Sequence, residues 1–167
     1  MLILSSLILE SAVIERVSFF DRLYKDALIF DPDVISILIG INDVWHRHGS
    51  NKIATTDAQI ELNYRSILQR IKEESNAKII IMAPFILDAE VPEGMREELA
   101  RILPIIRGLA DEYADAYIPL DEIFAEALKS QPEPFYYSKD GVHPNENGRE
   151  FIGKLYAEAI KPVIDSL

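Results

Sequence analysis

The sequence contains no cysteine. That absence excludes disulfide bonds, thiolate metal sites and a cysteine nucleophile. Basic residues are also scarce, because 17 Lys and Arg stand against 28 Asp and Glu and give a formal net charge of −11. A chain this acidic has no cluster of cations to neutralise phosphates, so we expect it to bind neither nucleic acid nor anionic membranes.

Long apolar runs are missing as well. The most apolar stretch, MLILSSLILE (residues 1–10), is far too short to span a membrane, and it lacks the basic start and small-residue cleavage site of a secretory signal. A buried strand is the favoured interpretation of this stretch. We therefore expect no membrane insertion and a cytoplasmic location.

What is present is an alternation of apolar β-rich runs and helical patterns. The chain has 167 residues, 49% of them hydrophobic, which fits a single domain over residues 1–167. We expect strands at Leu2–Leu9, Val34–Ile39, Lys78–Ala83 and 115–120, and helices at about 11–30, 56–73, 93–113, 121–129 and 146–160. This order predicts an α/β fold in which helices cover both faces of a parallel sheet.

Several helix ends carry specific signals. Thr56 and Gln59 have the spacing of a capping box, and Asp121 and Asn145 are predicted to cap the last two helices. Pro104 predicts a kink or a break inside its helix. The helix after Thr56 has its apolar residues at the spacing of one buried face: Ile60, Tyr64, Ile67, Leu68 and Ile71.

The segment GINDVWHRHG (residues 40–49) follows the strongest predicted strand. In open α/β sheets, ligands bind beyond the carboxyl ends of the strands. Gly40 allows a sharp turn there, Asp43 can brace it, and Asn42 offers an uncharged amide donor of the kind that an oxyanion hole needs. Because Asn and Asp also favour turns for local reasons, simple turn chemistry is the competing interpretation.

A second candidate is the segment DGVHP (residues 140–144), just before the last predicted helix. A carboxylate three residues before an imidazole can accept the Nδ1 proton, which fixes the tautomer. His143 would then present Nε2 as a general base, with Asp140 as its orienting acid. A loop histidine without chemistry is the alternative.

Three further side chains near Asp43 deserve an interpretation. His46 and His48 stand two residues apart, but two loop histidines are weak grounds for a metal site, so a solvated loop is favoured and no metal is expected. Trp45 is predicted to line the rim of a substrate pocket, and core packing is an equally open interpretation.

The pair of motifs, GIND after a strand and DGVHP before the final helix, resembles two sequence blocks of the SGNH (GDSL-type) ester hydrolases, and the similarity runs from about Phe20 to Ile160. The resemblance implies a flavodoxin-like three-layer α/β/α sandwich and ester hydrolysis through an acyl-serine, without cofactor or metal. It implies Asn42 as oxyanion donor, His143 as general base and Asp140 as its partner. Small acyl esters, lysolipids or acetylated sugars would be the substrates.

The sequence departs from this family at the nucleophile. No Gly-Asp-Ser occurs, and Gly40 is the first glycine of the chain, so the family's glycine oxyanion donor has no counterpart. Ser6–Leu7 can stand for the family's Ser-Leu, which makes Ser6 the candidate nucleophile and implies a sheet that lacks one edge strand. The alternative is an N-terminally truncated or degenerate member whose nucleophile segment lies upstream of Met1.

These departures leave two functional hypotheses: an ester hydrolase, or a scaffold of the same fold without a nucleophile. A nucleotide-binding protein is a weaker third, since no glycine loop for phosphates is present. Without the glycine donor and without an intact Gly-Asp-Ser, we expect hydrolysis of activated short-chain esters to be very slow or absent. An exposed sheet edge would also permit homodimers through strand pairing.

Overall fold

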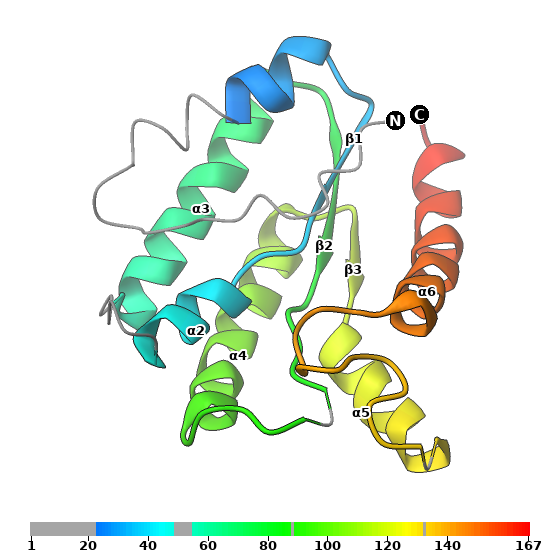
Figure 1. Cartoon of the computed structure of the whole chain (residues 1–167). Helices are drawn as coiled ribbons and strands as arrows, with labels where there is room; N and C mark the ends of the chain where they lie inside the picture. Colours follow the sequence, from blue (N-terminus) through cyan, green and yellow to red (C-terminus); the bar gives the residue numbers. More distant parts are fainter. Residues whose placement is uncertain (1–22, 49–54, 88, 132) are drawn as a thin grey trace.

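The structure is a computed structural model, and it describes residues 23–48, 55–87, 89–131 and 133–167 (Figure 1). The first predicted strand and Ser6 lie outside these residues, as does most of the first predicted helix. Where that helix is described, residues 23–26 are helical and a short 3-10 helix, η1 (Leu28–Phe30), follows.

The described strands form a parallel sheet of three, in the order β1–β2–β3. They are β1 (Val34–Ile37), β2 (Lys78–Met82) and β3 (Ala116–Ile118). Ile35 pairs with Ile79, so the first two strands are neighbours in the same direction. This confirms the predicted parallel sheet.

The first strand ends earlier than predicted. It stops at Ile37 rather than Ile39, because the chain turns away from the sheet toward Gly40, whose φ of 115° is a conformation that favours glycine. The strand's four residues are all buried, as expected for a strand covered on both faces.

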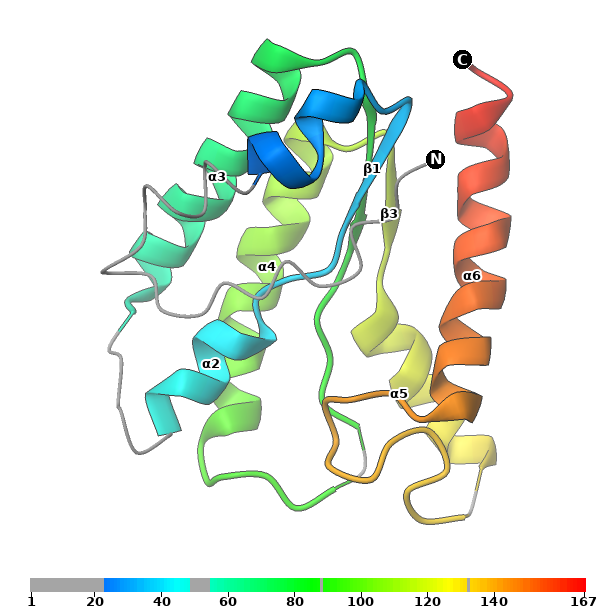
Figure 2. The same cartoon turned by 45° about the horizontal axis from the view of Figure 1, so that its top comes forward.

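Helices cover the sheet on both faces, as Figure 2 shows. The helices after η1 are α2 (Ile41–His48), α3 (Asp57–Glu74), α4 (Met95–Tyr113), α5 (Leu120–Ser130) and α6 (Glu146–Ile164). Ile79 and Ile81 pack in the core with α3 and α4, whereas Ile80 and Met82 pack with α5 and α6. The alternation along β2 thus builds the predicted three-layer sandwich. None of the described helices is both long and apolar enough to cross a membrane.

Most helix ends agree with their sequence signals. The Thr56 side chain accepts the Gln59 backbone N–H at 3.2 Å and Gln59 Oε1 accepts the Thr56 N–H at 2.9 Å, which confirms the capping box. The five predicted apolar residues of α3 are all buried. Asn145 caps α6 by accepting the Gly148 N–H at 3.1 Å.

One helix end differs from its sequence signal. Pro119, not Asp121, occupies the N-cap of α5, and Asp121 lies in the first turn, so that predicted cap is wrong. A capping side chain has to precede the first turn, and the N-cap of α5 lies two residues earlier than predicted, directly after the short β3. Pro104, where we expected a kink or a break, lies inside α4 and does not end the helix.

Candidate active site

Gly40 follows the carboxyl end of β1 and lies against Pro84, which follows the carboxyl end of β2. A Cβ at this position would lie 3.2 Å from Ile106 Cδ1 and 3.3 Å from Pro84 Cγ, so the backbone passes close to α4 and to the segment after β2. Together with the φ of 115°, this close approach explains why glycine stands here. The first helical residue, Ile41, follows directly.

Asn42 lies in the first turn of α2, at the carboxyl end of β1. The chain turns at Gly40, as predicted, but the residues after it form a helix and not a loop. Val44 is fully buried and anchors the turn, with its N–H 3.4 Å from the Gly40 carbonyl. Asn42 itself is half-buried, and its helix carries it at the edge of the sheet where ligands bind in this fold class.

The residues around Asn42 are partly withdrawn from water. Burial raises the pKa of Asp43 to about 6, and the positive charge of Arg47 and a backbone hydrogen bond reduce that rise. Trp45 is half-buried and packs against the core below α2, so the packing interpretation applies to at least part of its ring. Its predicted place at a substrate rim stays a prediction.

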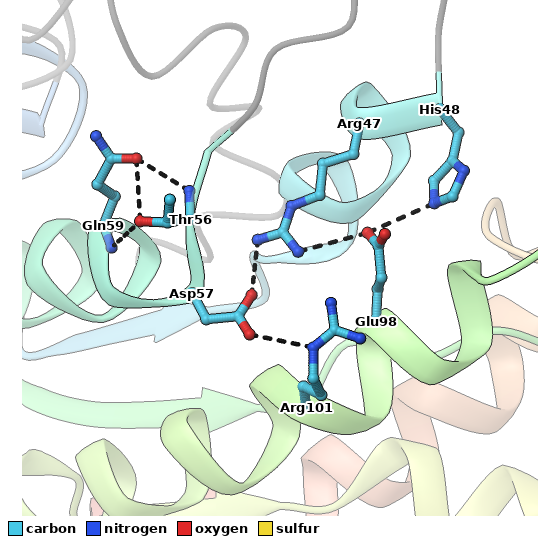
Figure 3. A network of polar contacts seen from close by, with 7 residues as sticks. All are labelled: Arg47, His48, Thr56, Asp57, Gln59, Glu98 and Arg101. Atoms are coloured by element: carbon cyan, nitrogen blue, oxygen red, sulfur yellow. Dashed lines mark hydrogen bonds and ion pairs between the residues drawn. The ribbon is translucent and has the colours of Figure 1, made fainter.

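The last turn of α2 is attached to two other helices by the charged network in Figure 3. Arg47 contacts Asp57 at the start of α3 at 2.9 Å and Glu98 of α4 at 3.4 Å, and its side chain is only 12% exposed. His48 Nε2 lies 3.4 Å from Glu98, and Arg101 bonds Asp57 at 3.2 Å. This network holds the helix that carries the candidate oxyanion donor.

We expect the Arg47→Ala variant to lose about 2 kcal/mol of unfolding free energy, because Asp57 and Glu98 would keep their charges without this partner. Desolvation raises the pKa of Asp57, but hydrogen bonds from Arg47 and Arg101 outweigh it and hold that pKa below its ordinary value. Urea denaturation at neutral pH measures the loss.

The control for this experiment is Lys129→Ala, which removes the exposed ion pair between Lys129 and Glu126. Exposed pairs contribute little, so this variant should stay within about 0.5 kcal/mol of the wild type. Equal effects of the two substitutions would show that the Arg47 network does not stabilise the fold.

Asp140 and His143 lie in the loop between α5 and α6. The His143 Nδ1 and Asp140 Oδ2 atoms are 2.7 Å apart, which confirms the predicted contact. Asp140 Oδ1 accepts the backbone N–H groups of Val142 at 3.1 Å and His143 at 2.9 Å. One carboxylate oxygen therefore holds the loop while the other faces the imidazole.

These contacts keep the Asp140 carboxylate ionised. Desolvation raises the pKa of Asp140, but the hydrogen bonds from His143 and Val142 outweigh it and hold that pKa well below its ordinary value. Their contribution to stability is therefore present above about pH 4 and is lost as the pH falls through the lower, folded-state pKa. An ionised Asp140 accepts the Nδ1 proton, and the side chain of His143 is 81% exposed, so Nε2 of the neutral ring is accessible to a substrate.

The loop docks on the chain that leaves β2. The Leu87 N–H donates to the Gly141 carbonyl at 2.7 Å. A Cβ on Gly141, whose φ is 86°, would lie 3.0 Å from Ala89 Cβ. Val142 packs against the same core cluster as Trp45. The structure thus brings the Asp140–His143 pair and α2 to the same, carboxyl, end of the sheet (Figure 1).

Sequence reasoning missed two residues that support the loop or the segment on which it docks. Ser138 is buried within the loop, and only the general turn preference of serine pointed to that position. Arg96 of α4 donates to the carbonyls of Ile86, Leu87 and Ala89 at 3.2, 2.7 and 3.1 Å. No sequence signal could single out an arginine whose partners are backbone atoms.

Metal binding has no support from the side chains around α2. Within residues 23–48, 55–87, 89–131 and 133–167, no group of three His, Cys, Asp or Glu side chains could hold a metal ion. His48, one of the two histidines considered for such a site, faces Glu98 instead.

Comparison with known proteins gives concordant matches. Residues 13–151 match the sequence model of the GDSL-like lipase/acylhydrolase family. An acetylxylan esterase of Geobacillus stearothermophilus is 27% identical over 143 residues, which are 83% of this chain and 64% of that esterase. The crystal structure of a GDSL-like lipase family protein from Parabacteroides merdae aligns with a TM-score of 0.77 and 32% identity, over 85% of this chain and 66% of that one.

A solved acetylxylan esterase from Geobacillus stearothermophilus, Axe2, aligns with a TM-score of 0.74 and 25% identity, over 87% of this chain and 67% of that one. Its catalytic mutants replace a serine, an aspartate and a histidine, and the last two stand three positions apart. Asp140 and His143 have the same spacing. The chain spans less than two thirds of the length of the first curated relative.

Proposed function

Because the chain belongs to the GDSL-like lipase/acylhydrolase family, we propose that it hydrolyses carboxylic esters through an acyl-serine intermediate. The observation that carries this proposal is the 2.7 Å contact between His143 Nδ1 and Asp140 Oδ2, which leaves Nε2 open at the carboxyl end of the sheet. Acetylated sugars are the proposed substrates, since two of the curated relatives are acetylxylan esterases.

In the first half of the proposed reaction, a serine hydroxyl oxygen attacks the ester carbonyl carbon while His143 Nε2 accepts the hydroxyl proton. The carbonyl oxygen becomes an oxyanion, which the Asn42 side-chain amide stabilises by a hydrogen bond. The bond to the alcohol oxygen then breaks, and His143 returns the proton to that oxygen. Asp140 orients the ring and stabilises the imidazolium that forms between these two transfers.

In the second half, water takes the place of the serine hydroxyl. His143 removes a proton from the water as it attacks the acyl carbon, Asn42 again stabilises the oxyanion, and the serine oxygen leaves with the proton from His143. The products are the carboxylic acid and the free serine, so the steps balance without a cofactor.

Ser6 is the proposed nucleophile. It lies inside the first apolar stretch, directly before Leu7, in the order that the family's Ser-Leu pair has, and it is outside the described residues. A scaffold without a nucleophile is the second candidate function, favoured by the absence of Gly-Asp-Ser from the sequence. We also keep as a proposal that two copies pair through a free sheet edge, which light scattering tests.

We expect the Asn42→Ala variant to lower kcat for p-nitrophenyl acetate and for acetylated xylo-oligosaccharides by about 100- to 1,000-fold, with little change in KM. The amide bonds the oxyanion more strongly than the ground-state carbonyl, so its loss affects the transition state. Stopped assays of acetate release measure the sugar reaction.

Asn63→Ala is the control, because Asn63 is an asparagine of another helix, α3, and does not belong to the proposed site. It should keep the wild-type rate. A wild-type rate in Asn42→Ala would remove Asn42 from the proposed site, and an inactive wild type would favour the scaffold.

A further inference from the structure

Ser138 is unusual among the polar residues of this protein. Of the residues that the structure describes, only three polar ones are buried, and Ser138 is 1% exposed. It lies between α5 and α6 and pairs with Pro144 in an isolated antiparallel bridge, so its backbone closes the loop that contains Asp140 and His143. A buried hydroxyl requires hydrogen-bond partners, and these partners show what it does.

All contacts of the Ser138 hydroxyl are with this loop. Its Oγ accepts the Gly141 N–H at 3.0 Å. It lies 2.8 Å from the His143 carbonyl and 3.1 Å from Asp140 Oδ1, the two acceptors to which it can donate. Since a hydroxyl has one hydrogen, it serves one of these acceptors at a time.

We propose that Ser138 is the positioning residue of the His143–Asp140 pair, an inference that rests on the proposed ester hydrolysis. Asp140 Oδ1 is surrounded by the Ser138 hydroxyl and by the N–H groups of Val142 and His143, at 3.1, 3.1 and 2.9 Å. These three contacts restrict rotation of the carboxylate. Oδ2 is thereby kept against His143 Nδ1, and the histidine is kept in the tautomer that leaves Nε2 free to act as a base.

Loss of the hydroxyl should loosen the pair without unfolding the loop. The Gly141 N–H would lose its acceptor, and Asp140 Oδ1 would lose the hydroxyl donor that it shares with the His143 carbonyl. Two backbone bonds remain, from Leu87 N–H to the Gly141 carbonyl and from Asn145 N–H to the Tyr137 carbonyl. Ser138→Ala also removes only one heavy atom from a packed site, so the chain should still fold.

The test compares Ser138→Ala with Ser130→Ala in the full chain. Ser130 is the control because its hydroxyl also donates a local hydrogen bond, to the Ala127 carbonyl. It differs in being exposed and in lying at the end of α5. For p-nitrophenyl acetate, we expect Ser138→Ala to lower kcat about 10- to 100-fold, as small misplacements of catalytic groups do, with KM nearly unchanged. Ser130→Ala should match the wild type.

Nitrogen NMR of the histidine rings supplies a readout that does not need activity. His143→Ala identifies the His143 signals among those of three histidines. In the wild type we expect the Nδ1-protonated tautomer alone, and in Ser138→Ala a mixture of tautomers with faster exchange of the Nδ1 proton. A purely structural serine would lower the unfolding temperature and leave the tautomer as it was.

The two readouts separate the two proposals. A tautomer shift in Ser138→Ala supports the positioning role even if the wild type hydrolyses no ester, in which case only the proposed function fails. An unchanged tautomer, or an unchanged kcat in an active enzyme, overturns the role of Ser138 and leaves the proposed function standing.

Discussion

The His143→Ala variant is expected to lose ester hydrolysis roughly a thousandfold or more, down to the uncatalysed background where the wild-type rate is low. The imidazole both removes the proton from the nucleophile and returns it to the leaving alcohol, so no step of the proposed reaction proceeds without it. Initial rates with p-nitrophenyl acetate at neutral pH measure the effect, and unfolding curves should show little change because the side chain is 81% exposed.

The control for this substitution is Lys139→Ala, which changes an exposed residue of the same loop. It should keep the wild-type rate, which would show that the loss is specific to the imidazole. If the His143→Ala variant also kept that rate, the general base would be another group, and the interpretation of the Asp140–His143 contact as catalytic would fail.

The second large effect concerns the nucleophile. Ser6→Ala should abolish hydrolysis as completely as His143→Ala, since the acyl-enzyme cannot form without the serine oxygen. Ser5→Ala, one residue earlier, is a closely matched control and should retain the rate. The same ester assay compares the four proteins.

Each alternative predicts a different pattern of activity among these variants. Activity that survives Ser6→Ala but not His143→Ala would mean that another serine, or water, is the nucleophile. Loss in Ser5→Ala alone would assign the role to the neighbouring hydroxyl. No activity in the wild type would favour the scaffold, in agreement with the missing Gly-Asp-Ser sequence.

The features that could be predicted from the sequence are mostly those formed by residues close together along the chain. Asp140 and His143 are three residues apart, so turn geometry alone can bring their side chains together. The capping box of Thr56 and Gln59 has the same spacing, and it formed as expected. The parallel order of β1 and β2 followed from strand–helix alternation, which leaves few topologies open.

What the sequence did not predict depends on contacts between distant segments. Arg47 contacts Asp57 and Glu98 only because α2, α3 and α4 lie close together at this point. The sequence around an arginine on a short helix does not indicate which distant carboxylates it will contact. The helix at Asn42 was also missed, because Gly, Asn and Asp in sequence favour turns as local chemistry. Burial of Val44 against the core outweighs that preference.

The most direct test of the central claim, acyl-serine chemistry with His143 as the base, is covalent labelling by a fluorophosphonate. An activated serine oxygen attacks the phosphorus, fluoride leaves, and the base accepts the hydroxyl proton. Trypsin should release residues 1–16 as one peptide, and tandem mass spectrometry can locate the adduct within it. The account requires a single adduct on Ser6 in the wild type and none in His143→Ala. No adduct in the wild type, or labelling that is unchanged in His143→Ala, would contradict it.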